Sequence, residues 1–334
     1  MDVTIAFMVL VGLLGGSIGS FLNVVIYRLP HPHLSIVKPA SRCPGCGTRI
    51  KAWHNIPIVG WLVIRGRCAA CRVPISPRYP LVELAMCALT VALFVKIVGG
   101  PPTPEALTSQ ELFGDILAPF ALYTVFVGGL IAAAFIDLDW FILPNELTLP
   151  GLIAGLATSA LVGHHIGVTW QDGLIGALVG ALFVLVIIYG WALLTGREGM
   201  GGGDFKLLAV IGAYLGWQVL PLVLLLSSVQ ALLFAALFRK SFLVEELPPD
   251  PMELTPTADS KEAAEAPTPD AAGDAPPEMP DDATGTATPD SDGSEGGSVM
   301  LLALPYGPFL ALAAIELLFF REELMDLVGM ALDG

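Results

Sequence analysis

The sequence predicts an all-α polytopic membrane protein with about eight transmembrane helices and a small cytoplasmic loop domain. Hydrophobic residues fill 54% of the 334 positions and charged residues only 14%, whereas soluble proteins carry roughly 25% charged residues. Crossing the hydrocarbon core takes about 20 mostly apolar residues per helix, and such stretches recur along the chain. Basic residues are distributed unevenly between these stretches, and this asymmetry gives the expected orientation.

The first apolar stretch, 3–27, has no charge inside it. A signal peptide would begin with a positive region and end at a small-residue cleavage site, so we expect a retained helix here. Six further stretches are interpreted as spans, and one shorter stretch as a span, a re-entrant segment or an interfacial one. The seven spans are 3–27, 80–98, 116–136, 147–163, 173–195, 218–238 and 299–320, and the shorter stretch is 205–217. Small residues at 173–182 suit close packing between helices in lipid.

Lysine and arginine near span ends mark the cytoplasmic side. Nine such residues and no acid lie from Arg28 to Pro80, so we expect this loop to face the cytoplasm. If 205–217 crosses the membrane, Arg239 and Lys240 also reach the cytoplasmic side, and otherwise they lie outside. Eight spans with both termini outside is therefore the more economical topology.

The formal net charge of −15 comes from one segment. Residues 244–298 hold 15 of the 31 acidic residues, one base (Lys261) and ten prolines. Such a composition cannot bury enough apolar surface to offset the entropy of ordering, so we expect a disordered cytoplasmic loop. Docking of a partner there is the alternative. The expected division is a first span (1–27), a cytoplasmic four-cysteine module (28–79), a transmembrane core (80–243), the acidic loop (244–298), and a last span with its tail (299–334).

Two Cys-x-x-Cys pairs lie in the basic loop, with 21 residues between them: Cys43 with Cys46, and Cys68 with Cys71. Pairs at such spacing can present four thiolates to a zinc ion, and a reducing cytoplasm disfavours disulfides. A structural zinc ion would hold together a module too small to fold otherwise. A thiol redox site and free thiols are the alternatives. Cys87, inside the second span, is expected to pack against neighbours.

Three carboxylates stand at the ends of apolar stretches. Asp137 and Asp139 directly follow an uncharged run, and Asp204 follows a glycine-rich stretch that begins at Gly199. Ionisable groups at membrane depth are costly and so suggest function, although each residue taken singly could instead cap a helix. The topology puts Asp137 and Asp204 on the same side of the membrane, where they can meet.

Two neighbouring carboxylates cannot both ionise easily, so one of them keeps its proton. The ionised partner can take a proton from water as that water attacks a peptide carbonyl. The protonated partner can bond the carbonyl oxygen and later protonate the leaving amine. The pair Asp137 and Asp204 therefore predicts an aspartyl peptidase, and the glycines before Asp204 would let the backbone approach closely.

These features together resemble the type IV prepilin peptidase family of bacterial membrane aspartyl proteases, over nearly the whole chain apart from 244–298. Four motifs appear in the family's order. They are Gly19-Ser-Phe-Leu-Asn through Pro30, the two cysteine pairs, Phe135-Ile-Asp-Leu-Asp with Leu143-Pro144, and Gly201-Gly-Gly-Asp204-Phe-Lys206. The family often has Leu-Pro-Asp where this chain has Leu-Pro-Asn145, outside the pair of aspartates.

The resemblance implies cleavage of the basic leader of type IV prepilins or type II secretion pseudopilins, at the cytoplasmic face of the bacterial inner membrane. It implies that Asp137 and Asp204 are catalytic, and we expect support from Asp139, Gly201, Gly203 and Lys206. Family members with the cysteine module usually also methylate the new N-terminus with S-adenosylmethionine, for which no glycine-rich site is recognisable here. The expected partners are leader peptides and the lipid bilayer, without nucleic acid, and the oligomeric state is open.

Two other functional classes are alternatives. A proton-coupled transporter could use the same aspartates, but transporters often place such groups near the midplane on broken helices. A zinc-bearing scaffold without chemistry would leave the aspartates unexplained. Packing or interfacial anchoring is the plainer interpretation of three further polar candidates, Asn23, Arg28 and Glu83. The five histidines show no ligand spacing with one another, so we expect loop or interfacial positions for His31, His33, His54, His164 and His165.

Overall fold

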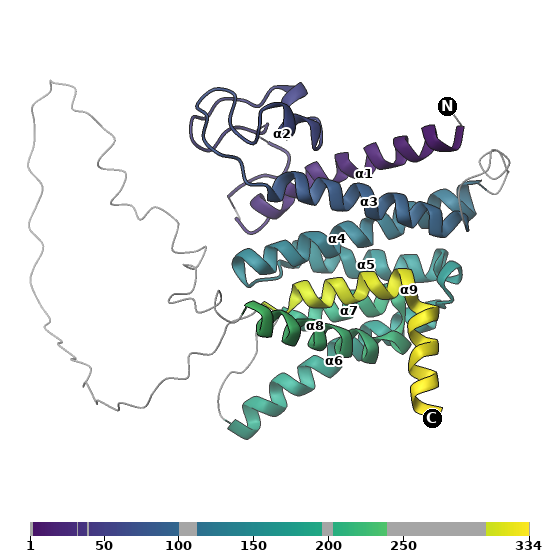
Figure 1. The fold of residues 1–334 in the computed structure, drawn as a ribbon. Coiled ribbons are helices and arrows are strands. Elements are labelled where there is room, and N and C mark those ends of the chain that lie inside the picture. The colour runs from purple at the N-terminus through teal and green to yellow at the C-terminus, as the bar shows by residue number, and fades with distance from the viewer. Residues whose placement is uncertain are drawn as a thin grey trace, which may run out of the picture. The chain divides into compact units, whose positions relative to one another are not determined.

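The computed structural model describes residues 3–31, 33–38, 40–99, 112–195, 203–238 and 305–333. Within them the regular structure is helical, apart from two isolated β-bridges in the cysteine module (Figure 1). The expectations for Gly201, Arg239, Lys240, the acidic loop at 244–298 and the start of the last span lie outside the described residues. The all-α class is therefore confirmed for the described part.

Five segments of the described chain are helices long and apolar enough to cross a membrane, and they coincide with five of the seven expected spans. They belong to α1 (Val3–Arg28), α3 (Arg78–Val98), α4 (Ala118–Trp140), α6 (Trp170–Thr195) and α8 (Leu220–Phe238). The chain is thus a multi-span helical protein, in agreement with its high apolar content.

The other helices differ from simple spans. Helix α5 (Asn145–Leu161) has 17 residues, and α9 (Gly307–Asp333) is broken at Phe320, whose φ is −123°. Helix α7 (Asp204–Leu215) has 12 residues, which rise about 18 Å against a hydrocarbon core of about 30 Å. The count of eight spans is therefore still a prediction.

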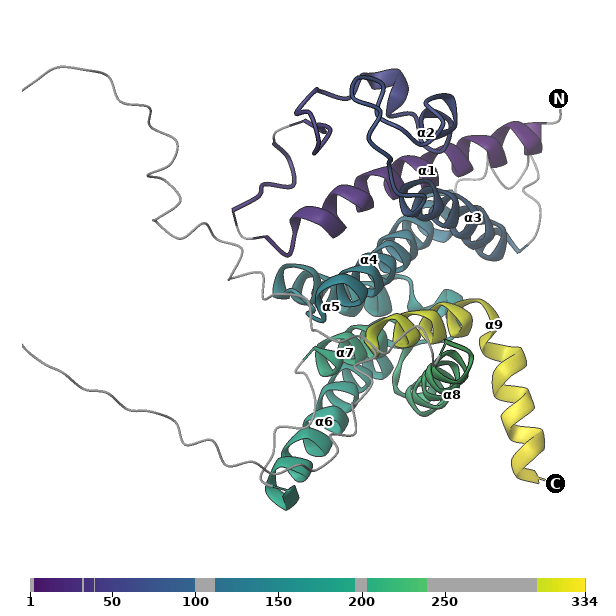
Figure 2. The ribbon, with the colours of Figure 1, turned by 60° about the vertical axis from the view of Figure 1, so that its left-hand side comes forward.

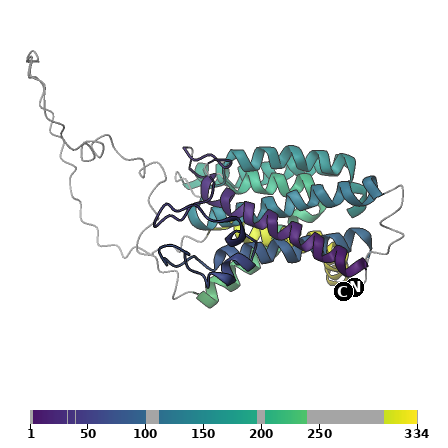
Figure 3. The same ribbon diagram turned by 90° about the horizontal axis from the view of Figure 1, so that it is seen from above.

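Glycines allow the closest contacts between helices. Helix α1 packs on α3, and α6 packs on α7; Figures 2 and 3 show both pairs from other directions. A Cβ on Gly15 of α1 would meet Thr90 Oγ1 at 2.6 Å, and a Cβ on Gly176 of α6 would collide with the carbonyl oxygen of Gly212 in α7. These contacts agree with the prediction that the small residues at 173–182 serve close packing.

Helix α4 is the most enclosed of the candidate spans and contacts α1, α3, α5 and α9. Its buried residues include Tyr123, Ala132 and Ile136. Its last turn is only partly enclosed, because Asp137 is buried there while Leu138 is exposed. That turn carries the first of the predicted site residues.

Candidate active site

Asp137 lies in the last turn of α4, which ends at Phe141 in the left-handed region (φ 54°). The side chain is buried, with 7% of its surface exposed. Its Oδ2 atom accepts a hydrogen bond of 2.8 Å from the backbone amide of Gly307, the first residue of α9. A buried carboxylate needs such a donor, because an unpaired one would lose its solvation without compensation.

Asp204 is the first residue of α7 and is partly buried, and α7 is not one of the five candidate spans. Burial and, as a second cause, the charge of Asp137 raise the pKa of Asp204 to about 6. The two aspartates are 67 positions apart in the chain, and the pairing of Asp137 with Asp204 as catalytic residues stays a prediction.

Tyr306 and Gly307 lie beside both aspartates. The backbone amide of Gly307 donates a hydrogen bond to Asp137. Tyr306 and Asp204 line the same cavity of about 420 Å³. The hydroxyl of Tyr306 pairs with Ser227 Oγ at 2.6 Å and Ser228 Oγ at 3.0 Å, which fixes it against α8. The rest of the cavity wall is apolar, and its members are Phe183, Val184, Ile187, Leu208, Leu224 and Leu310. This space can take an apolar chain segment next to Asp204.

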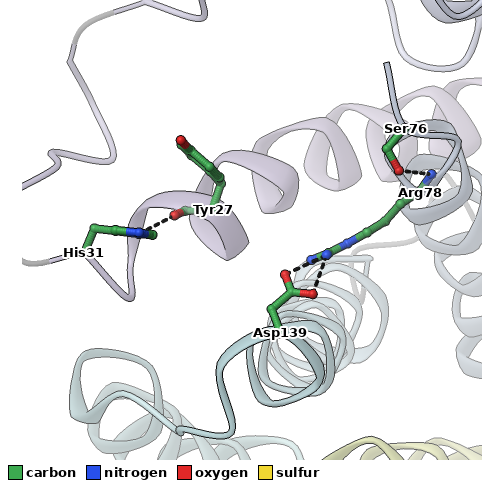
Figure 4. Close-up of polar contacts among 5 residues, drawn as sticks. All are labelled: Tyr27, His31, Ser76, Arg78 and Asp139. Atoms are coloured by element: carbon green, nitrogen blue, oxygen red, sulfur yellow. Dashed lines mark hydrogen bonds and ion pairs between the residues drawn. The ribbon is translucent and has the colours of Figure 1, made fainter. Parts of the chain in front are cut away.

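Asp139 has a different partner. Arg78, at the start of α3, donates to both carboxylate oxygens of Asp139 at 2.6 and 2.7 Å, as Figure 4 shows. The same guanidinium lies over the ring of Phe135, 4.7 Å from its centroid. Asp139 therefore links α4 to α3 and the cysteine module.

The remaining predicted support residues surround the start of α7. Lys206 Nζ donates to Asn145 Oδ1 at 2.7 Å, which ties α7 to the start of α5. A Cβ on Gly203 would meet Leu143 Cδ1 at 3.2 Å, so this glycine lies close against the loop after α4. Gly201 lies outside the described residues.

The four cysteines come together in the segment between α1 and α3. All four sulfurs lie within 4.8 Å of one another, with Cys43 and Cys71 at 3.7 Å and Cys46 and Cys68 at 4.0 Å. Four sulfurs 2.3 Å from a tetrahedral zinc ion would be about 3.8 Å apart. The cluster therefore fits a zinc ion without rearrangement.

The loops that carry the two Cys-x-x-Cys pairs share one backbone hydrogen-bond pattern. In the first, the amide of Cys43 donates to the carbonyl of Thr48 at 3.0 Å, and in the second the amide of Cys68 donates to Val73 at 2.9 Å. The amides of Cys71 and Ala70 lower the pKa of Cys68 to about 6, which favours the thiolate that binds metal. The amide of Val73 lowers the pKa of Cys71. Burial and the neighbouring sulfurs have the larger combined effect and raise the pKa of Cys71 to about 11.

Polar side chains fasten this module to the helices. Glu83 of α3 is buried and accepts a hydrogen bond of 2.6 Å from the amide of Ile58, which holds the strained φ of 62° at that residue. Asn23 of α1 donates to the carbonyl of Tyr79 at 3.1 Å, and Arg28 donates to that of Ser35 at 2.9 Å. In the described structure these three residues make anchoring contacts, in line with the plainer interpretation.

A second cavity, of about 520 Å³, lies beside α5 and the end of α1. Its polar wall includes His31, Asn145, Glu146 and Lys206, but most of these groups already have partners. Lys206 bonds Asn145, and His31 contacts the carbonyl of Tyr27 at 2.9 Å (Figure 4). These contacts do not identify the ligand of the cavity, and it is assigned to no cofactor.

The sequence interpretation missed Tyr306 and Gly307. Any residue carries a backbone amide, so the type of residue gives no sign that its amide will meet a carboxylate. The available signal was Gly307 followed by Pro308 at the start of an apolar stretch, a pair typical of a sharp entry into a helix.

Two known family models match this chain. Residues 13–97 match the Bacterial Peptidase A24 N-terminal domain, and residues 124–236 match the Type IV leader peptidase family. A protein of Aeromonas hydrophila named prepilin leader peptidase/N-methyltransferase is 43% identical over 63% of this chain and 74% of its own length. One of Myxococcus xanthus with the same name is 36% identical over 93% of this chain and 90% of its own. No solved structure matches the fold.

Proposed function

This chain belongs to the Type IV leader peptidase family, and from that premise we propose that it cleaves the leader from prepilins or pseudopilins and methylates the new N-terminus. It is a membrane aspartic endopeptidase. Asp137 and Asp204 form the catalytic pair, with Gly307 holding Asp137 in place. The observation that carries the proposal is that two consecutive residues lie beside the two aspartates: Gly307 donates to Asp137, and Tyr306 lines a cavity with Asp204.

The pair shares one proton between its two carboxylates. The ionised carboxylate takes a proton from a water molecule, and the resulting hydroxide adds to the scissile carbonyl carbon. The protonated carboxylate donates to the carbonyl oxygen as negative charge develops there. Collapse of the tetrahedral intermediate breaks the C–N bond, and the leaving amine receives a proton from the pair. Low solvent exposure supports this chemistry, because it strengthens each charge interaction.

We propose that the substrate lies in the cavity beside Asp204. Its wall is apolar apart from Asp204, Ser228 and Tyr306, so it suits an apolar stretch of substrate adjoining the scissile bond. The basic leader would remain outside this cavity, near the membrane surface. We place the enzyme in the bacterial inner membrane with its active site toward the cytoplasm, because nine bases and no acid lie from Arg28 to Pro80.

Cys43, Cys46, Cys68 and Cys71 would hold a zinc ion, which would fix the fold of the module between α1 and α3. Methylation would use S-adenosylmethionine as the methyl donor. The described residues offer no fitting site for it, so no step of methyl transfer is derived. None of the relatives reported above is named a transporter, and no observation favours the proton-coupled transporter.

Cleavage of a purified prepilin in liposomes tests the catalytic pair. Asp137→Asn and Asp204→Asn should each lower kcat/KM by about a hundredfold or more, because general acid–base catalysis contributes about 10²–10⁴. Asp139→Asn is the matched control, since this carboxylate pairs with Arg78, and it should stay within a few-fold of wild type. Full cleavage by either of the first two variants would remove that residue from the mechanism.

A further inference from the structure

A cluster of metal-binding side chains lies at the opposite end of α4 from Asp137. Asp115 belongs to the single π-helical turn η2 (Leu112–Leu117), which leads into α4. His164 and His165 belong to the 3₁₀ turn η3 (Gly163–Ile166), which follows α5. The 23 residues of α4 rise about 34 Å, so this cluster is separate from the aspartate pair.

The three side chains converge on one point. One ring nitrogen of each histidine and one carboxylate oxygen of Asp115 all lie within 4.8 Å of one another. The two imidazole rings are 4.2 Å apart between centroids. Two imidazoles and a carboxylate are the ligand types that zinc and neighbouring transition metals take from proteins, often with water completing the shell.

An independent observation concerns Nε2 of His165. This atom is buried and has no hydrogen-bond partner among the described residues. Buried polar atoms in folded proteins nearly always have a partner. A metal ion bound to this nitrogen would supply the partner that it lacks.

We propose that Asp115, His164 and His165 bind a divalent first-row transition metal ion, with zinc as the first candidate. The ion would join the turn before α4 to the turn after α5. Under the proposed topology this end faces the extracytoplasmic side, so the ion comes from outside the cell membrane. The histidines showed no ligand spacing in the sequence because the third ligand lies 49 positions before His164.

Metal stoichiometry of the full-length protein in detergent tests the proposal. After removal of bound metal and reconstitution with zinc alone, wild type should hold one zinc ion more per chain than the variant His164→Gln/His165→Gln. A matched control, His31→Gln/His33→Gln, changes two other neighbouring histidines and should retain the wild-type zinc content. Reconstitution with cobalt separates the sites, because cobalt bound by thiolates of the cysteine cluster absorbs by charge transfer and cobalt bound by nitrogen and oxygen does not.

A second variant changes only Asp115, the exposed carboxylate ligand, and leaves both histidines in place. Asp115→Asn should weaken zinc binding at this site on the order of tenfold or more, while the cobalt–thiolate absorption stays unchanged. Equal zinc content in wild type and the histidine variant would overturn the proposal. So would full displacement of the second zinc ion by millimolar magnesium, since that behaviour indicates a nonspecific acidic surface.

Discussion

Gly307 is the residue whose backbone amide contacts a proposed catalytic carboxylate. Its amide donates to Asp137 at 2.8 Å, and a Cβ added to it would meet Asp137 Oδ2 at 2.6 Å. A glycine is needed here because any side chain would push the carboxylate away from its donor. The neighbouring Tyr306 is held by Ser227 and Ser228, so the backbone at 307 has little freedom to retreat.

The substitution Gly307→Ala should lower kcat/KM by about a hundredfold, because a displacement of roughly 1 Å in a catalytic group can cost that much. The protein should still insert and fold. Gly129→Ala is the matched control, since Gly129 lies in α4 with nothing within 4 Å of an added Cβ. Leader cleavage in liposomes provides the measurement, and wild-type activity in Gly307→Ala would show that this contact is dispensable.

At this scale the sequence predicted the residues whose chemistry is in the side chain. Asp137 and Asp204 were recognisable because charges rarely follow long apolar stretches, and the four cysteines because their spacing is regular. Gly307 was not recognisable, because its contribution is a backbone amide and an absent side chain. The sequence could not predict the partner of Asp139, because Arg78 is one of nine basic residues from Arg28 to Pro80.

Among the helices, the contact of α6 with α7 positions Asp204. Gly176 and Gly180 of α6 pack against the backbone of α7, with a Cβ on Gly180 meeting Leu208 O at 2.6 Å. Helix α7 has only 12 residues, so its position depends on such contacts more than on its own stability.

Gly212→Ala in α7 should therefore destabilise the protein by about 1–3 kcal/mol, the usual cost of overpacking, since the new Cβ would collide with Gly176 O. Cleavage should fall with it, because Asp204 moves with α7. Gly190→Ala in α6, where an added Cβ has open space, should leave both properties nearly unchanged. Thermal unfolding in detergent measures the effect, and equal melting temperatures for the two variants would contradict this account of the contact.

The apolar stretches predicted five spans well, because length and composition determine whether a helix can cross lipid. They also singled out the shorter stretch 205–217, where the structure has the short helix α7. They did not predict the break in α9 at Phe320, which depends on contacts with other helices. Arg321, just after that break, donates to the carbonyl of Leu215 at the end of α7. A hydrogen bond between elements so distant in sequence leaves no local pattern.

At the scale of the whole molecule, we expect different interactions to stabilise the two parts. Zinc binding would stabilise the cysteine module, and apolar packing would stabilise the helical core. Removing zinc with a chelator should make residues 40–77 sensitive to protease, because a segment of this size has too little core to fold alone. The helical circular-dichroism signal should persist, since α1, α3 and α4 pack through apolar contacts. Mapping the first cleavage sites with and without metal checks this. Cleavage first inside α4 would show that the module and the core unfold together.

The bond between Asp137 and Gly307 spans 170 positions of the chain, and this separation affects how the enzyme is made. A ribosome completes both of the proposed catalytic aspartates long before it reaches the glycine that contacts one of them. A chain terminated before Gly307 therefore lacks the amide that Asp137 accepts from. Under the proposed mechanism, such a chain should have no peptidase activity until the last helix is in place.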